Sequence, residues 1–186
     1  MKTRTLLPML LLLTCACAQA QNSNMSAPAG AAAPPAQQAA PARSDAEATI
    51  KGKKISINYG RPALKGRDVL AQAPVGTVWR VGMNAATEIT TAADLTVGGK
   101  ELKAGKYSLW VRRTGEDTWT LAFHPKTGVW GAPPLKEGYV AELPLKLEKA
   151  SDSMETLTIS LADAKGDGEI KIHWGTALMS GKFSVK

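Results

Sequence analysis

The sequence predicts an all-β protein: an antiparallel β-sandwich, with a small β-barrel as the alternative architecture. Two observations favour this class. Apolar residues alternate with polar ones over many short runs, and clusters rich in glycine or proline separate those runs. In addition, no segment combines a sustained helical period with helix caps. Eight to ten short strands at this spacing are typical of two packed sheets or a small barrel.

The predicted strands follow one another from residue 55 to the end of the chain. Their alternating apolar positions are Ile55, Ile57 and Tyr59; Tyr107, Leu109 and Val111; Trp119, Leu121 and Phe123; Leu143, Leu145 and Leu147; Leu157, Ile159 and Leu161; Ile170, Ile172 and Trp174; Phe183 and Val185. Turn signals lie between them at residues 98–99, 105, 115–117, 128, 133–134 and 166–168. One face of each strand is therefore expected to be buried, as in an antiparallel sheet.

Three segments are expected along the chain. Residues 1–20 have the basic start, apolar stretch and small-residue cleavage pattern of a secretory signal peptide. Residues 21–43 are almost wholly Ala, Pro, Gln, Ser and Asn, which predicts a disordered tether. Residues 44–186 have the size of a single β domain. Because the apolar stretch is shorter than the roughly 20 residues that span a bilayer, we expect an exported, periplasmic or secreted protein with no transmembrane segment.

Both cysteines, Cys15 and Cys17, lie in the predicted leader. Cleavage after Ala20 would leave a chain without thiols, so stability would come from the core and not from disulfides. The alternative is a lipoprotein anchored through Cys15, since Leu12, Leu13 and Thr14 precede that cysteine in lipoprotein fashion. The sequence leaves this alternative open.

The charge is positive but diffuse. Loss of Lys2 and Arg4 with the leader lowers the basic count from 23 to 21 against 16 acidic residues, so the net charge falls from +7 to about +5. Nucleic-acid binding requires a concentrated basic stripe with stacking aromatics or a known motif, and the chain has neither. We therefore expect no nucleic-acid partner.

A dense polar block lies between residues 58 and 91, in the runs NYGRPALKGR and VWRVGMNAATEIT. Arginine beside aromatic rings can hold an anion, a carboxylate or a sugar face, and a turn of glycine and cations can bind an anion. The same arginines could instead pair internally with Glu88 or Asp94 and lock a strand to a loop. The candidate ligand-binding residues in the block are Arg61, Lys65, Arg67, Arg80, Asn84 and Glu88.

Aromatic residues supply the other candidates. Trp110 has the opposite parity to Tyr107, Leu109 and Val111, so it is expected to face outward, where it could stack on a sugar or a partner. Trp130, in a glycine-bounded loop, is the second such candidate. By contrast, Tyr107 enters its strand directly after a glycine turn. This arrangement predicts a structural hydrogen bond from its hydroxyl to that turn.

Few residues favour catalysis. The histidines, His124 and His173, each end an apolar run without a ligand partner at metal-binding spacing, and the HExxH, CxxC and GxSxG motifs are missing. We therefore assign no catalytic residue, metal or cofactor. The alternatives left open are a small periplasmic hydrolase that uses Glu88 and a histidine, or a carboxylate pair such as Glu88 and Asp94, and a purely structural envelope protein.

The order of several motifs resembles a known family. YGRP, KGR and WRVGMNAAT are followed by DLTVGGKELKAGKYSLWV, WTLAF, a later WG and a final HWG. This combination, which extends over residues 49–186, resembles the secreted bacterial family catalogued as domain of unknown function 2911. The resemblance implies an exported, mostly β protein and transfers no catalytic residue.

Together these features predict an exported binding or envelope-associated module with an anionic or carbohydrate-like ligand. Arg61, Arg67, Arg80 and Asn84 would hold that ligand, and Trp110 or Trp130 would provide a stacking surface. The partner would be a small molecule, a glycan or an envelope component, and the oligomeric state is left open.

Overall fold

The computed structural model describes residues 43–67, 70 and 72–186, so the predicted leader and nearly all of the predicted tether lie outside the described residues. The described part contains ten strands and no helix. The strands are β1 (Arg43–Ile50), β2 (Lys53–Gly60), β3 (Val78–Trp79), β4 (Thr87–Thr91), β5 (Leu95–Val97), β6 (Lys100–Leu102), β7 (Gly105–Arg113), β8 (Trp119–His124), β9 (Ala141–Ala164) and β10 (Asp167–Val185). No helix in these ranges is long and apolar enough to cross a membrane.

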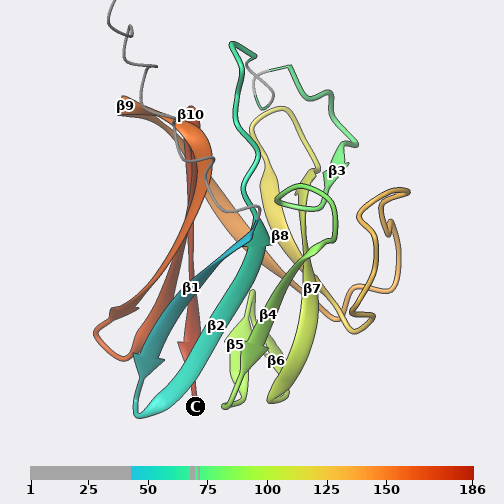
Figure 1. Ribbon diagram of the computed structural model, residues 1–186. Helices are drawn as coiled ribbons and strands as arrows, with labels where there is room; N and C mark the ends of the chain where they lie inside the picture. Colours follow the sequence, from blue (N-terminus) through green and yellow to red (C-terminus); the bar gives the residue numbers. More distant parts are fainter. Residues whose placement is uncertain (1–42, 68–69, 71) are drawn as a thin grey trace, which may run out of the picture. The chain divides into compact units, whose positions relative to one another are not determined.

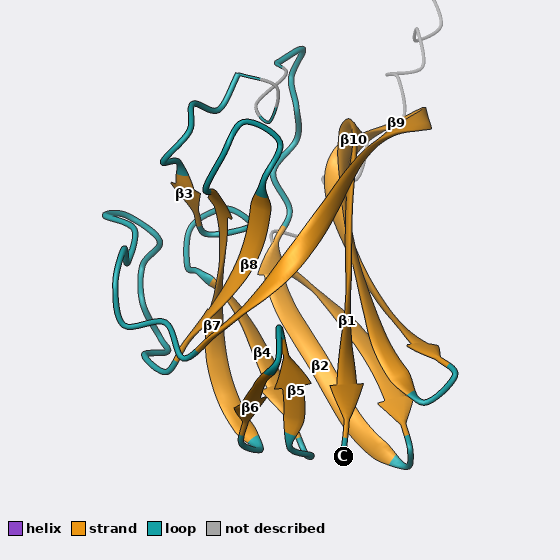
Figure 2. Ribbon diagram, turned by 180° about the vertical axis from the view of Figure 1, so that it is seen from behind, coloured by secondary structure: helices purple, strands orange, loops and turns teal. Residues whose placement is uncertain are grey.

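All ten strands belong to one antiparallel sheet, which confirms the all-β antiparallel prediction. The order is β1-β2-β4-β7-β8-β9-β10-β5-β6, with β3 paired to β7 beyond the end of β4. The sheet folds over, so that β1 and β2 contact β9 (Figures 1 and 2). The two layers of the sandwich are thus parts of one continuous sheet. Since β1 and β6 remain as its ends, the barrel alternative is not adopted.

The strands β9 and β10 are longer than the sequence predicts. The expected runs 143–147 and 157–161 are both parts of β9, and 170–174 and 183–185 are both parts of β10. The first half of β9 pairs with both β8 and β10, whereas its second half pairs with β10 and, among the named strands, with no other. These two strands therefore connect the layers, and in Figure 1 they form the long hairpin beside β1 and β2.

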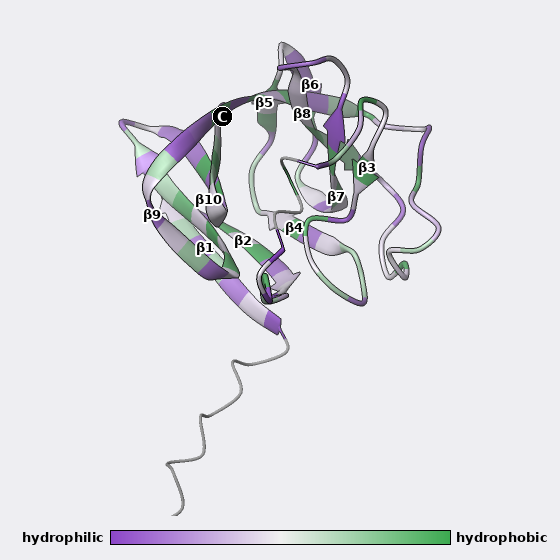
Figure 3. Ribbon diagram, turned by 90° about the horizontal axis from the view of Figure 1, so that it is seen from above, coloured by the Kyte–Doolittle hydropathy of each residue, from purple (hydrophilic) through white to green (hydrophobic). Residues whose placement is uncertain are grey.

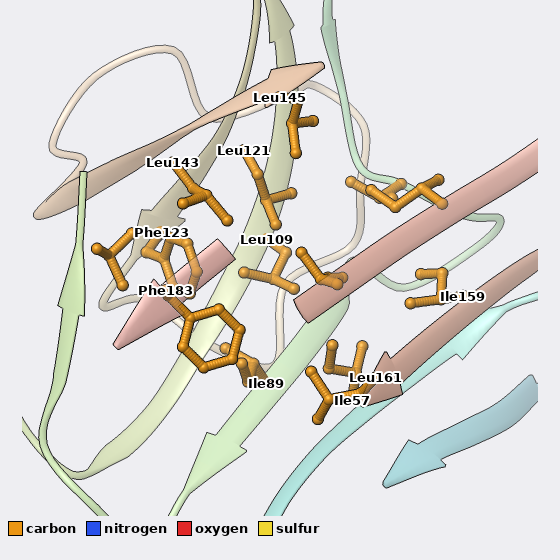
Figure 4. Packing of buried hydrophobic residues seen from close by; sticks show 14 of the residues in the cluster. Ile57, Ile89, Leu109, Leu121, Phe123, Leu143, Leu145, Ile159, Leu161 and Phe183 are labelled. Carbon is orange, nitrogen blue, oxygen red and sulfur yellow. The ribbon is translucent and has the colours of Figure 1, made fainter. Parts of the chain in front are cut away.

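The core lies between the layers, where the alternating residues converge. Figure 4 shows Ile57 of β2, Ile89 of β4 and Leu109 of β7 facing Ile159 and Leu161 in the second half of β9. These side chains are at most 9% exposed. Figure 3 shows hydrophobic and hydrophilic residues alternating along the strands. Each buried leucine or isoleucine side chain contributes about 1.5–3 kcal/mol of transfer free energy, so this face dominates the stability of the fold.

Candidate functional site

The first half of the polar block extends the sheet. After β2 ends at Gly60, residues 61–64 run antiparallel to β9. The Leu64 N–H donates to the Glu155 carbonyl at 2.8 Å, and the Leu157 N–H donates to the Pro62 carbonyl at 3.0 Å. Pro62 lacks an N–H, so it can only accept here. The run YGRPAL thereby attaches the end of β2 to the second half of β9.

The cations of this half contact backbone and loop atoms. Arg61 Nε donates to the Leu157 carbonyl at 3.3 Å. Arg67 closes a short turn, since both its N–H and its Nε donate to the Leu64 carbonyl at 3.1 Å. The Lys65 N–H donates to a Glu155 carboxylate oxygen at 3.0 Å. Arg61 and Lys65 therefore contact β9 directly, whereas Arg67 closes the turn beside that junction.

The alternative of an internal clamp between arginine and Glu88 or Asp94 is wrong for the residues that the structure describes. Glu88 pairs with Lys106 at 2.6 Å, and Asp94 pairs with Lys103 at 2.9 Å. The guanidinium groups of Arg61 and Arg80 donate hydrogen bonds to backbone carbonyls instead.

The second half of the block forms a strained turn. Val81 and Asn84 have left-handed φ angles of 54° and 63°. For a buried β-branched valine this conformation is unfavourable by about 1–3 kcal/mol. Thr87 compensates: its hydroxyl donates to the Val81 carbonyl at 2.8 Å and its N–H to the Arg80 carbonyl at 3.2 Å. Strain of this kind persists only where the surroundings determine the backbone, so the position of Arg80 and Asn84 is fixed.

The turn packs against Gly60, which brings the two halves of the block together. A Cβ on Gly60 would lie 2.3 Å from the Met83 carbonyl oxygen, and a Cβ on Gly82 would lie 3.0 Å from the Gly60 carbonyl oxygen. Only glycine permits this approach of two backbones. The glycines of YGRP and VGMN are thus explained by a single contact.

Residues 129–131 of the loop between β8 and β9 pack against this turn and place Trp130 beside it. The Gly131 N–H donates to the Asn84 carbonyl at 3.1 Å, and Ala85 forms a β-bridge with Trp130. Arg80 Nη1 donates to the same Asn84 carbonyl at 3.2 Å, and the Arg80 carbons lie against Gly131. The Trp130 side chain is 64% exposed. We call Arg80, Asn84 and Trp130 the Arg80–Trp130 surface.

Glu88 anchors the same loop from one side. Its Oε1 accepts the Gly128 N–H at 2.6 Å, and its Oε2 pairs with Lys106. Burial acts to raise the pKa of Glu88, but the Gly128 hydrogen bond, Lys106 and Arg43 outweigh it and hold that pKa below its usual value. The carboxylate is therefore ionised and its contacts are structural.

The expectation that Trp110 is exposed is wrong. Its parity places it on the face opposite the main core, but it is completely buried there by the loop between β8 and β9. Its Nε1 donates to the Ser108 hydroxyl at 2.9 Å, which in turn donates to the Lys126 carbonyl at 2.8 Å. The residues that form this second cluster with Trp110 are Ala86 and Ala122, with Val78, Val129, Leu135 and Tyr139 packed against them.

Tyr107 forms a structural hydrogen bond, and the two histidines lie beside positions that are far apart along β9. The Tyr107 hydroxyl donates to the Lys103 carbonyl at 2.9 Å, which confirms the predicted turn contact. The histidines do not meet: His124 ends β8 near Ala141, whereas His173 pairs with Thr158. Those β9 positions are 17 residues apart, roughly 55 Å along the strand. No group of three potential metal ligands occurs within the described ranges.

The prediction from sequence missed Arg43, which it placed in the tether. Arg43 begins β1, and its Nε donates to Asn58 Oδ1 at 2.7 Å. Its Nη atoms donate to the carbonyls of Ala85 and Ala86 at 3.2 and 3.4 Å, so it supports the strained turn. Nothing in the flanking Ala and Pro residues signals this role.

The Arg80–Trp130 surface combines an aromatic and a cationic side chain. It presents an exposed indole, a guanidinium with donors to spare and fixed backbone around them. An indole face can stack on a sugar ring, and a guanidinium can bind a carboxylate or sulfate in a bidentate manner.

Comparisons with curated proteins and with solved structures find no match. A family model described as "Protein of unknown function (DUF2911)" matches residues 41–183. This match covers most of the chain and confirms the resemblance that the ordered motifs indicate. The chain therefore belongs to the family of proteins of unknown function 2911.

Proposed function

We propose that this protein is an exported, non-catalytic binding module that holds a carbohydrate-like ligand with an anionic group on the Arg80–Trp130 surface. The observation that supports the proposal is the coincidence of Trp130, Arg80 and a strained turn. Among the described residues, the exposed large hydrophobic side chains are those of Val75, Trp130, Val140 and Leu147, and only Trp130 is aromatic.

The turn gives this aromatic residue a charged neighbour. The Asn84 carbonyl accepts from both Gly131 and Arg80, so one backbone atom orients the Trp130 loop and the guanidinium. The guanidinium carries five N–H donors, so a single hydrogen bond to Asn84 leaves several for an anion. A sugar acid combines the two chemistries, a ring face for the indole and a carboxylate for the guanidinium.

Export and envelope association are part of the same proposal. The basic start, apolar stretch and cleavage pattern of residues 1–20 support secretion, and residues 21–43 would serve as a spacer. Positive charge on the mature chain would favour retention near anionic envelope material. Lipidation of Cys15 would anchor the module without changing the surface.

Calorimetric titration with three probes tests the proposal: oligogalacturonate as an acidic glycan, maltohexaose as a neutral glycan, and sulfate as an anion without a sugar. We expect oligogalacturonate to bind, maltohexaose to bind at least about tenfold more weakly and sulfate not to bind measurably, because the charged hydrogen bonds add about 1.5–3 kcal/mol. Trp130→Ala should abolish binding of both glycans, and Arg80→Ala should remove the preference for the acidic one.

Matched controls are an exposed cation and an exposed apolar residue elsewhere. Lys53→Ala in the β1–β2 turn region and Val75→Ala should leave every titration unchanged. Failure of both glycans to bind, or equal binding by wild type and Trp130→Ala, would refute the proposal.

A further inference from the structure

A second candidate site lies away from Arg80 and Trp130, in a groove of about 480 Å³. Its walls come from the end of β7, the turn that follows and the start of β8, from the first half of β9, from the middle of β10, and from Leu70. Pockets that hold ligands usually measure about 300–1,000 Å³. The residues that line it are Leu70, Arg113, Glu116, Asp117, Trp119, Leu147, Glu148, Lys149, Thr176 and Ala177.

A break in the β9–β10 ladder opens this groove. Ala177 pairs with Lys149, but Gly175, two residues earlier, pairs with Met154. The intervening residues 150–153 therefore bulge out of β9, and Thr176 has no ladder partner on β9. Bulges of this kind are over-represented beside binding sites. Here the bulge leaves Thr176, which lines the groove, without a ladder partner on β9.

The bottom of the groove is apolar and carries an exposed leucine. Trp119 and Leu70 are 3% and 6% exposed, whereas Leu147 is 42% exposed. Leu147 lies on β9 opposite Met179 of β10, so the strand pairing holds it in place. An apolar side chain that lies on Leu147 and Ala177 would remove this exposed surface from water.

The charged side chains that line the groove are the carboxylates of Glu116, Asp117 and Glu148 and the cations of Arg113 and Lys149. The Arg113 guanidinium is already bound, because Nε and Nη2 donate to the Glu116 carbonyl at 3.1 and 2.5 Å and Nη1 donates to the Ala73 carbonyl at 2.5 Å. It also lies 5.5 Å from the Trp119 ring centre. Glu116 and Asp117 form no ion pair with any described residue. These two carboxylates are therefore available to a cation.

We propose that this groove binds an extended peptide segment of a partner protein in which lysine or arginine flanks a large apolar residue. The apolar side chain lies on Leu147, and the cation lies beside Glu116 and Asp117. The peptide hydrogen-bonds to Thr176, which has no ladder partner on β9. Carboxylates on the rim would repel an anionic membrane surface, so a peptide fits the groove better than a lipid headgroup.

Fluorescence anisotropy with three labelled hexapeptides tests this inference. The peptides are Gly-Lys-Leu-Leu-Lys-Gly, a version with glutamine in place of lysine, and a version with glutamate. We expect the lysine peptide to bind about fivefold more tightly than the glutamine peptide, since exposed ion pairs contribute little each, and the glutamate peptide not to bind. Raising the salt concentration should reduce the difference between the first two.

Three variants, one of them a control, locate the binding. Leu147→Asp should weaken binding of the lysine peptide at least tenfold, while Val140→Asp, at another exposed apolar residue, should not change it. The double variant Glu116→Lys with Asp117→Lys should reverse the preference, so that the glutamate peptide binds more tightly than the lysine peptide. The reversal is a gain of binding, which misfolding cannot imitate.

Three results would overturn the inference. These are no binding of the lysine peptide, an unchanged preference in the charge-reversed variant, and binding of phosphatidylglycerol vesicles that Leu147→Asp abolishes. The last result would make the groove a membrane-binding surface. Because none of these peptides contains a sugar, and the variants leave Arg80 and Trp130 intact, failure here would not bear on the glycan proposal.

Discussion

Gly131→Ala should drive the Arg80 side chain off the surface that it shares with Trp130. A Cβ on Gly131 would lie 1.9 Å from Arg80 Cδ and 2.8 Å from its Cβ and Cγ, whereas ordinary contact begins near 3.4 Å. The arginine must therefore move by roughly 1.5 Å or more. The backbone of residue 80 is held by Thr87, so it cannot follow freely. We expect a loss of about 1–3 kcal/mol in the free energy of unfolding.

A double-mutant cycle isolates this contact. In the Arg80→Ala background the Cγ and Cδ contacts disappear and only the 2.8 Å Cβ contact remains. Gly131→Ala should therefore lower the free energy of unfolding by less in that background than in the wild type. We expect a coupling energy of about 1 kcal/mol or more between the two sites. Urea unfolding followed by circular dichroism measures the four free energies. Equal costs of Gly131→Ala in both backgrounds would refute this placement of Arg80.

Three further predictions follow from burial and hydrogen bonding. Trp130→Ala should change the unfolding free energy by about 0.5 kcal/mol or less, because the side chain is exposed, whereas Trp110→Ala should cost about 3–5 kcal/mol in the same urea titration. Glu88 has a lowered pKa, so its stabilisation is present above its usual pKa of 4.5 and is lost as the pH falls through the lowered value. The unfolding free energy of Glu88→Gln should therefore depend less on pH below 4.5 than that of the wild type. Tyr107→Phe should cost about 0.5–1.5 kcal/mol in thermal unfolding, and no loss would mean that its hydroxyl bond is not formed.

The strands were predictable because apolar and polar residues alternate along them, and this alternation indicates which face of each strand is buried. Ile57, Leu109 and Leu121 all lie in the core, as their alternation predicts. The length of β9 was not predictable, because the polar residues 148–153 interrupt the alternation where the strand leaves the core and bulges. A polar interruption of this kind looks the same in the sequence whether the chain bulges within one strand or reverses direction between two strands.

The candidate site was predictable in part, for a similar reason. Parity placed Trp110 on the correct face of β7, but its burial depends on Tyr139 and Leu135, which are distant in sequence. The polar block has two roles: Arg61 contacts β9 and Arg67 closes the adjacent turn, whereas Arg80 lies against Gly131, next to Trp130. That division depends on the Gly60 contact with Met83, which no local pattern reveals.

The central claim is that the Arg80–Trp130 surface binds an acidic glycan, and indole resonances test it directly. The chain has five tryptophans, so a ¹H–¹⁵N spectrum shows five indole N–H signals, and loss of one signal in Trp130→Phe assigns that residue. Titration with oligogalacturonate should shift the Trp130 signal and leave those of Trp110 and Trp174, which are buried, nearly unchanged. No shift at Trp130, or a larger shift at Trp119 in the groove, would contradict the account.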